Sequence, residues 1–329
     1  MKRTKIVGTG YYVPEKVVTN HDLAKIMDTS DEWIISKIGI RERRIASSDE
    51  CTSDMVVKAS EMAMKNANVK AEDIDMILLA TNFPDHISPA TSVMIQKKLG
   101  AKNAFAFDIR TGGCPGSVYS ISVASKYIAD GTCNTVLVTT ADMNSKGLDW
   151  TDRSTAVIFG DGAAAMVLKA ADKDDIGGII DSQLYSDPEG YYSAYIPAGG
   201  VVEPITEEVI KEGKQFFKMD GRAIFNFATT VFPETVNKIV LDNNLSLEEI
   251  DFVISHQANI NIIKESMKRL NLSMEHTYCN VDKYGNTGSA SVGIAFAEAL
   301  EKGVIKKGDK VVLVSFGAGT AWGAVLLEI

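Results

Sequence analysis

Two similar stretches of this chain, AEDIDMIL at residues 71–78 and LEEIDFVI at residues 247–254, indicate its fold. Each places a short acidic segment before a run of apolar residues, which predicts a turn leading into a buried strand. Further along, the turn at Cys114-Pro115-Gly116-Ser117 is echoed, at nearly the same spacing, by Asn286-Thr287-Gly288-Ser289. Two matches in the same order indicate an internal duplication, which would place Cys114 and Asn286 at equivalent turns.

Short β-branched runs continue through both halves, as at residues 136–139 and 310–314, with amphipathic segments between them. Strands that alternate with helices predict an α/β layered fold. A polar break at residues 170–175 lies near the midpoint of the chain. We therefore expect an N-terminal half at residues 1–172, which carries Cys114, and a C-terminal half at residues 173–329, which carries His256 and Asn286.

Composition excludes several classes of protein. The 329 residues are 45% hydrophobic, which is typical of a globular protein with a sizeable core. The net charge of -9 argues against binding to nucleic acid or to an anionic membrane surface, because both need a concentrated basic face. No segment has the roughly 18 apolar residues of a membrane span, and no apolar stretch that could be a secretory signal follows the first residues. We expect a cytoplasmic location.

The cysteines lie far apart, at Cys51, Cys114, Cys133 and Cys279, and none forms a C-x-x-C pair. This spacing favours a reducing compartment over a disulfide framework. His276 and Cys279 have ligand-like spacing, but a lone pair does not make a metal site, so no metal is expected.

Cys114 is the first candidate for a catalytic role. It follows a predicted strand that ends near Arg110, and it precedes a predicted helix that stops at Asp130-Gly131. At a helix N-terminus, unpaired N–H groups and the helix dipole would lower the pKa of the thiol. The alternative is a small buried cysteine that only packs. The glycines before Cys114 and Pro115 after it favour a nucleophile.

His256 and Asn286 are the other candidates. His256 follows the predicted strand at residues 252–255, and α/β proteins collect active-site groups at the carboxyl ends of strands. Taken alone, His256 could be a hydrogen-bonded core histidine, and Asn286 could be only a turn former. The duplication changes this interpretation, because it brings the turns that carry Cys114 and Asn286 together around a pseudo-twofold axis.

The chain resembles β-ketoacyl-acyl-carrier-protein synthase III and related condensing enzymes over essentially its whole length. The motifs that carry the resemblance are TSDEWI (29–34), GIRER (39–43), TDR (151–153), FGDGA (159–163), HQAN (256–259), GNT (285–287) and WG (322–323). The resemblance implies a thiolase fold, in which two similar halves stack in five αβαβα layers, and a homodimer.

The resemblance also implies catalytic roles. By similarity, Cys114 takes an acyl group from a thioester, usually acyl-coenzyme A. His256 and Asn286 then hold the carbonyl of a malonyl unit, carried by acyl carrier protein or coenzyme A, and favour the enolate released on decarboxylation. This carbanion attacks the acyl-cysteine in a Claisen condensation. Backbone N–H groups of Cys114 and Ala318 would form an oxyanion hole for the acyl group. No cofactor is implied beyond the coenzyme A thioester substrates.

Matching positions suggest where coenzyme A would bind. Trp33 and Arg153 match residues that flank its adenine, and Asn259 matches a residue that lines the pantetheine tunnel. Lys37 stands near the nucleotide, where an arginine is common in the family.

Three further residues bear on the acyl group and the carrier protein. Ser88 occupies a position where several relatives place a phenylalanine that reaches across the dimer and closes the partner's acyl pocket. The smaller serine predicts a primer longer than acetyl, unless another bulky group fills the space. Lys268 and Arg269 are the candidates for docking the acidic acyl carrier protein.

Some residues depart from the family pattern. Pro115 follows the nucleophile, and Asn226 and Asn261 occupy positions that are often basic. These departures keep an alternative open, in which a specialised acyltransferase or secondary-metabolism synthase passes the acyl group of Cys114 to a different acceptor. A third hypothesis is a non-catalytic partner subunit, and the intact Cys114, His256 and Asn286 argue against it.

Overall fold

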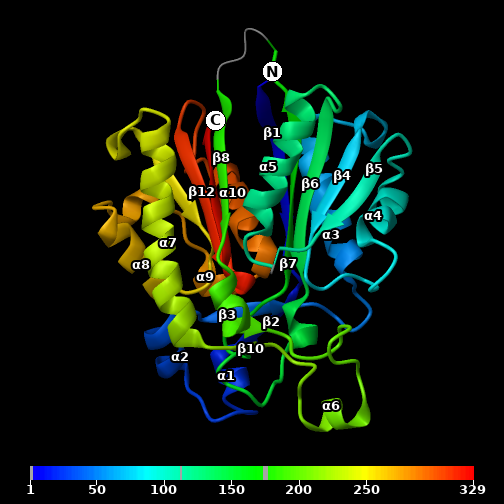
Figure 1. Cartoon of the computed structure of the whole chain (residues 1–329), viewed down its shortest axis with the longest axis vertical. Coiled ribbons are helices and arrows are strands. Elements are labelled where there is room, and N and C mark those ends of the chain that lie inside the picture. Colours follow the sequence, from blue (N-terminus) through cyan, green and yellow to red (C-terminus); the bar gives the residue numbers. More distant parts are fainter. Residues whose placement is uncertain (1–2, 112, 173–176) are drawn as a thin grey trace.

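The computed structural model describes residues 3–111, 113–172 and 177–329, and its described elements form five layers (Figure 1). Two sheets stand face to face with a layer of helices between them, and further helices cover the outer face of each sheet. This is the predicted αβαβα arrangement.

The first sheet is built from residues of the N-terminal half, in the order β1-β7-β6-β4-β5. Its strands are β1 (Thr4–Tyr12), β4 (Met76–Ala80), β5 (Phe105–Ile109), β6 (Thr135–Asp142) and β7 (Gly162–Ala170). β4 pairs in parallel with both β5 and β6, whereas β7 runs antiparallel to β6 and β1. Every residue of β4 is buried, as its continuous apolar run predicts for a parallel strand covered on both faces.

The second sheet comes from the C-terminal half and has the order β11-β12-β13-β8. Its strands are β8 (Gly178–Ser186), β11 (Phe252–Ser255), β12 (Lys310–Gly317) and β13 (Ala321–Glu328). β11 and β12 are parallel, and the other neighbours are antiparallel, so the sheet repeats the pattern of β4, β6, β7 and β1.

The helices fill the remaining three layers. α5 (Gly116–Ala129) and α10 (Ser291–Glu301) lie between the sheets, α3 (Thr52–Ala67) and α4 (Thr91–Leu99) cover the first sheet, and α7 (Gly221–Asp242) and α8 (Ile260–Arg269) cover the second. The central core includes Ile121 and Ile128 of α5 packed with Val292 and Phe296 of α10. Burial of such side chains, worth about 25 cal/mol per Å² of apolar area, holds the two halves together.

The repeat is incomplete at one edge of the second sheet. The short 3₁₀ helix Leu247–Glu249 before β11 matches Ala71–Asp73 before β4, as the two similar stretches predict. However, Val281–Tyr284, the counterpart of the end of β5, forms the short helix α9 instead of a strand. Among the described residues, no strand of the second sheet is equivalent to β5.

Smaller elements gather below the sheets in Figure 1. They are the hairpin of β2 (Lys16–Thr19) and β3 (Glu42–Ile45), the pair β9 (Ala194–Tyr195) and β10 (Lys218–Met219), and the helices α1 (Asn20–Leu23), α2 (Asp31–Ile38) and α6 (Glu207–Lys211). Among the helices of the described residues, none is long and apolar enough to cross a membrane.

Candidate active site

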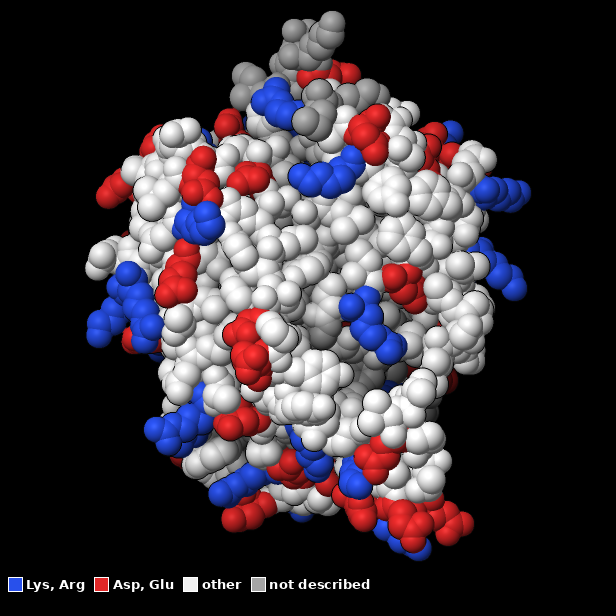
Figure 2. Space-filling model, in the orientation of Figure 1, with Lys and Arg blue, Asp and Glu red and all other residues white. Residues whose placement is uncertain are grey.

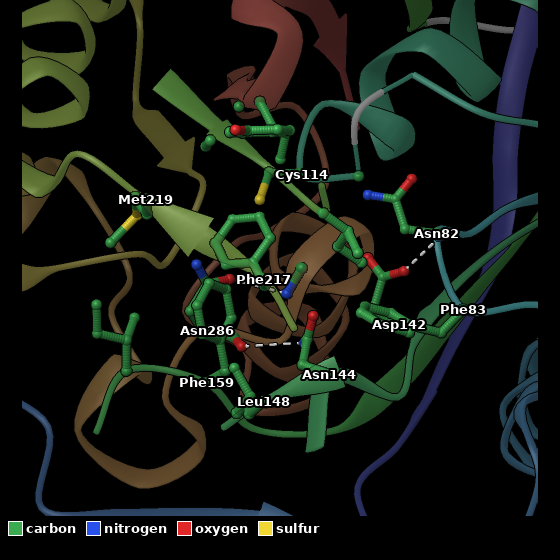
Figure 3. A pocket seen from close by; sticks show the side chains of 18 of the residues that line it. Asn82, Phe83, Cys114, Asp142, Asn144, Leu148, Phe159, Phe217, Met219 and Asn286 are labelled. Atoms are coloured by element: carbon green, nitrogen blue, oxygen red, sulfur yellow. Dashed lines mark hydrogen bonds between the residues drawn. The ribbon is translucent and has the colours of Figure 1, made fainter. Parts of the chain in front are cut away.

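A cavity of about 1320 Å³ is lined by residues of both halves, and Cys114, His256 and Asn286 all line it. The structure therefore brings together the three side chains that the sequence singles out. Figure 3 shows the side chains of Cys114 and Asn286 at the same hollow.

Cys114 lies in the turn between β5 and α5. The helix begins at Gly116 and Pro115 is its N-cap. The end of β12 packs directly against this turn. The Ser315 hydroxyl donates to the Cys114 carbonyl at 2.7 Å, and a Cβ on Gly317 would lie only 2.8 Å from the Cys114 Cβ. The second half thus fixes the position of the thiol.

The expected lowering of the thiol pKa is wrong for this structure. Burial raises the pKa of Cys114 to about 12, and the negative charge of Asp142 raises it further, outweighing hydrogen bonds from the backbone and Asn286. Cys114 is partly buried where it lines the cavity, and desolvation of its sulfur disfavours the thiolate. The resting side chain is therefore a thiol.

His256 follows β11 directly and is 2% exposed. Burial lowers the pKa of its imidazole to about 3, so the ring is neutral. Its Nδ1 lies 2.5 Å from the Ser291 Oγ, which also accepts the backbone N–H of Gln257 at 3.3 Å. The Ser291 hydroxyl keeps its own proton and can donate it to Nδ1. That arrangement leaves the His256 proton on Nε2, as a hydrogen-bond donor.

Asn286 is 5% exposed and lies before the 3₁₀ helix Gly288–Ala290 and α10. Its Oδ1 accepts the backbone N–H of Gly288 at 2.8 Å, so the amide nitrogen is the atom left to donate. The backbone of Asn286 pairs with the segment around Phe159, through hydrogen bonds with Ile158 and Gly160. The site thus holds two neutral side chains that can donate hydrogen bonds.

Sequence reasoning missed three polar residues that line the same cavity, namely Asn82, Asp142 and Asn144. Asn82 follows β4, and Asp142 ends β6. The carboxyl ends of parallel strands collect active-site groups, and this rule could have found both. Burial raises the pKa of Asp142 to about 6, although backbone N–H groups of Asn82 and Ser289 donate to its carboxylate.

The residues predicted to bind coenzyme A gather at another part of the cavity. Trp33, Lys37 and Asn259 line it, and the Asn259 amide donates to the Lys37 carbonyl at 3.3 Å. The Arg153 guanidinium lies over the Trp33 ring at 5.2 Å and donates to the Asp28 carbonyl at 2.7 Å. Trp33 and Arg153 are therefore in direct contact, and a base that entered between them would displace Arg153.

Ser88, Lys268 and Arg269 are absent from the lining of the cavity that Cys114, His256 and Asn286 share. Ser88 is exposed and is absent from the lining of its own chain's cavity, whereas its neighbour Ile87 lines the cavity and is 91% exposed. Lys268 and Arg269 form the last turn of α8. Arg269 pairs with Glu265 at 2.9 Å and donates to the Thr229 carbonyl, while Lys268 is exposed. The roles of these residues stay predictions.

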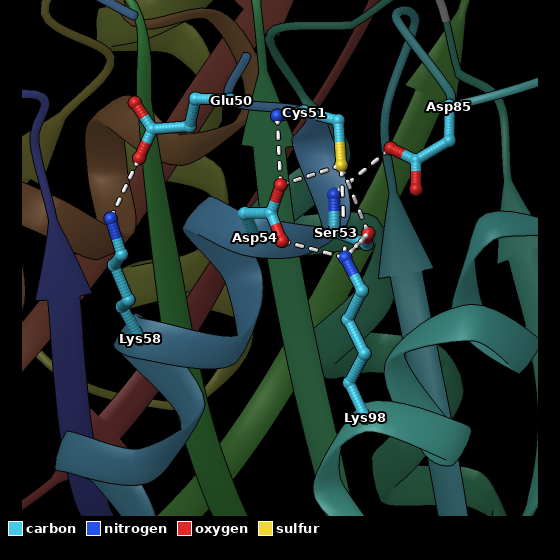
Figure 4. Close-up of polar contacts among 7 residues, drawn as sticks. All are labelled: Glu50, Cys51, Ser53, Asp54, Lys58, Asp85 and Lys98. Atoms are coloured by element: carbon cyan, nitrogen blue, oxygen red, sulfur yellow. Dashed lines mark hydrogen bonds and ion pairs between the residues drawn. The ribbon is translucent and has the colours of Figure 1, made fainter. Parts of the chain in front are cut away.

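Cys51 also lines the cavity, but its thiol belongs to a local network (Figure 4). It caps α3 and donates to the Asp54 carboxylate at 2.8 Å, and Lys98 pairs with the same carboxylate at 2.6 Å. Within residues 3–111, 113–172 and 177–329, no cluster of three or more His, Cys, Asp or Glu side chains could hold a metal ion.

Comparison with known proteins places this site in a family. The family models "3-oxoacyl-(acyl-carrier-protein) synthase III" and "3-oxoacyl-(acyl-carrier-protein) synthase III C terminal" match residues 107–188 and 241–329. The β-ketoacyl-acyl-carrier-protein synthase III of Clostridium acetobutylicum is 43% identical, and the match covers 100% of this chain and 99% of that protein. The corresponding protein of Caldanaerobacter subterraneus is 44% identical over 98% of this chain and 97% of its own length.

A solved structure supports the same family assignment. The crystal structure of 3-oxoacyl-acyl-carrier-protein synthase III from Aquifex aeolicus superposes with a TM-score of 0.91 and 38% identity, over 99% of this chain and 100% of that one. The chain therefore belongs to the β-ketoacyl-acyl-carrier-protein synthase III family, whose members are acyltransferases of the condensing-enzyme class with the thiolase fold.

Proposed function

We propose that Cys114 carries the acyl group and that His256 and Asn286 drive a decarboxylative condensation with a malonyl thioester. The observation that supports this most is the convergence of the Cys114 thiol and two neutral donors on one cavity. Neutral donors suit the reaction, because they can stabilise an oxygen that becomes negative only in the transition state.

In the first half-reaction, the Cys114 sulfur attacks the carbonyl of acyl-coenzyme A and the carbon–sulfur bond to coenzyme A breaks. The thiol proton passes overall to the departing coenzyme A thiol, so charge and atoms balance. Backbone N–H groups of Cys114 and Ala318 would hold the oxyanion, since Gly317 brings this loop against the Cys114 turn. The covalent intermediate splits one difficult transfer into two easier ones.

In the second half-reaction, a malonyl thioester loses carbon dioxide, and the electron pair becomes an enolate. His256 Nε2–H and the Asn286 amide would hold its oxygen. The carbanion then attacks the acyl carbonyl, the bond to Cys114 breaks, and the sulfur takes up a proton. Removing one preorganised donor of this kind typically costs about 3–4 kcal/mol of transition-state stabilisation.

The substrates enter this proposal by resemblance, with support from the cavity. Trp33, Lys37, Arg153 and Asn259 would bind coenzyme A, and Lys268 and Arg269 would contact acyl carrier protein if the malonyl unit arrives on it. We propose two structural halves that divide at residues 172 and 173, assembly as a homodimer and residence in the cytoplasm. No cofactor is needed, because the thioesters supply the chemistry.

The decisive experiment compares three variants by half-reaction. Cys114→Ala should lose acyl mass gain from acyl-coenzyme A in intact-mass measurements, while Cys133→Ala, as a matched control, should keep it. His256→Ala and Asn286→Ala should still acylate but release carbon dioxide from the malonyl thioester roughly 100-fold more slowly. Acylation of the Cys114→Ala protein would refute the assignment. Acylation without carbon dioxide release in the unaltered protein would favour transfer to a different acceptor.

A further inference from the structure

The part of the cavity beside Cys114 combines apolar walls with unexpected amide groups. Its walls include Leu148, Phe159, Phe217 and Met219, which suit an alkyl chain. Asn82 and Asn144 interrupt this apolar lining. We call this region, as drawn in Figure 3, the acyl end of the cavity.

Asn144 presents one hydrogen-bond acceptor in a fixed orientation. Its Nδ2 donates to the Gly160 carbonyl at 2.8 Å and to the Asn286 carbonyl at 3.4 Å. Reversing the amide would turn Oδ1 toward two carbonyl oxygens, so the contacts fix which atom faces the cavity. Figure 3 shows this oxygen turned toward the hollow below Cys114. Among the described residues, no donor satisfies it.

Asn82 can present a complementary donor. Its backbone N–H is held by the Asp142 carboxylate at 2.7 Å, which anchors the residue at the cavity wall. The side-chain amide has no hydrogen-bond partner among the described residues, and its Nδ2 lies so close to Gly113 that a Cβ there would meet it at 2.5 Å. The amide nitrogen is therefore available to a group bound beside Cys114.

Asp142 limits what that group can be. Its two carboxylate oxygens already accept the backbone N–H groups of Asn82 and Ser289, at 2.7 and 2.6 Å. A carboxylate on the acyl chain would lie near this acid and opposite the Asn144 oxygen, and both would repel it. A keto oxygen could accept from Asn82 but would leave the Asn144 oxygen unpaired. A hydroxyl can accept from Asn82 and donate to Asn144.

We propose that the acyl group accepted by Cys114 carries a hydroxyl group, and that Asn82 and Asn144 select it. This inference rests on the proposed acylation of Cys114 and names its substrate class. An alkyl group at the same place would displace water from both amides without replacing its hydrogen bonds. The unpaired amides would make binding of the alkyl group less favourable than binding of a hydroxyl group.

The test measures acylation of Cys114 alone, as kcat/KM for coenzyme A release, with butanoyl-, 3-hydroxybutanoyl-, 4-hydroxybutanoyl- and glutaryl-coenzyme A. We expect one hydroxyacyl substrate to exceed butanoyl by about tenfold or more, the value of one or two net hydrogen bonds. Asn144→Leu and Asn82→Ala should each reduce this ratio several-fold. Met219→Leu, which changes the shape of the same wall without removing an amide, should leave the ratio unchanged.

This test distinguishes failure of the hydroxyl selection from failure of the proposed acylation of Cys114. Faster acylation by butanoyl or glutaryl than by both hydroxyacyl substrates would overturn the inference while leaving the acyl-cysteine in place. Absence of acylation by every substrate would overturn the proposed function itself. Asn82→Ala removes no contact of Asn286, so an unchanged ratio in this variant would refute the selection even if Asn144→Leu also disturbed the neighbouring turn.

Discussion

At the scale of single residues, the balance between burial and charge sets the protonation state of Cys114, the proposed nucleophile. Cys114 lies just before a helix, but desolvation and the nearby Asp142 charge outweigh that position and raise the thiol pKa. Helix dipole effects reach about 2 kcal/mol even in favourable sites, whereas full burial can shift a pKa by several units. Burial also lowers the pKa of His256 and keeps its ring neutral.

Asp142→Asn should lower the pKa of the Cys114 thiol, because it removes the negative charge that opposes the thiolate. The pH profile of iodoacetamide alkylation at Cys114 should therefore move to lower pH. The difference between the two proteins should vanish below about pH 6, where the Asp142 carboxyl becomes protonated. Asp85→Asn is the control, since Asp85 lines the cavity but contributes no shift to the thiol. A profile that stays in place or moves to higher pH would contradict this account.

At the scale of elements, the two equivalent turns are packed against each other. The Ser117 hydroxyl of α5 donates to the Ser289 carbonyl at 2.5 Å, and the Ser289 hydroxyl donates to the Ala80 carbonyl at the end of β4 at 3.1 Å. Gly116 lies between them, where a Cβ would meet the Ala80 Cβ at 2.7 Å and the Ser289 Cβ at 2.9 Å. The helix that follows the nucleophile can approach the other half only because this residue is glycine.

Gly116→Ala should lower the free energy of unfolding by about 1–3 kcal/mol, because neither neighbouring Cβ is the flexible end of a side chain. Acylation should slow as well, since Cys114 is two residues away. Urea unfolding and intact-mass acylation measure the two effects. Gly200→Ala, where a Cβ would meet no atom within 4 Å, is the matched control and should change stability by less than about 0.5 kcal/mol. Equal stability of both variants would show that α5 can move away from Ala80 and Ser289 at no cost in free energy, and would contradict this prediction.

At the scale of the whole molecule, one edge of the first sheet is suited to self-association. β5 is the last strand of that sheet, and its Phe105 is 44% exposed while stacking on Phe107 at 6.4 Å. Uncovered strand edges with apolar side chains readily pair with another chain. Figure 2 shows a broad area with few charges across the middle of one face, with charged side chains around it. Both features support the proposed homodimer.

Phe105→Glu should convert the dimer to a monomer, because a charge at the strand edge would be buried without a partner. Sedimentation velocity at several concentrations measures the change. The control is Tyr192→Glu, which changes a side chain that is 74% exposed and lies outside β5. This variant should stay dimeric. A monomeric unaltered protein, or a dimeric Phe105→Glu protein, would contradict the proposed interface.

The dimer also bears on chain length. If Ser88 of one subunit faces the acyl pocket of the other, Ser88→Phe should shift acylation toward shorter groups in a series from acetyl- to decanoyl-coenzyme A. Each buried CH₂ is worth about 0.8 kcal/mol, so a few lost methylenes would change the rate ratio more than tenfold. A natural preference for acetyl, or an unchanged series in the variant, would refute the role of Ser88.

Sequence alone determined the two-half α/β architecture, since apolar runs and the paired stretches at residues 71–78 and 247–254 are local signals of strands and of duplication. It also singled out Cys114, His256 and Asn286 as candidates, because a turn between a strand and a helix is visible in local composition. Only the tertiary structure decided the protonation of Cys114 and His256, which depends on burial by the other half. It alone placed Asn82, Asp142 and Asn144 beside the thiol, because strands far apart in the sequence end at the same edge of the sheet.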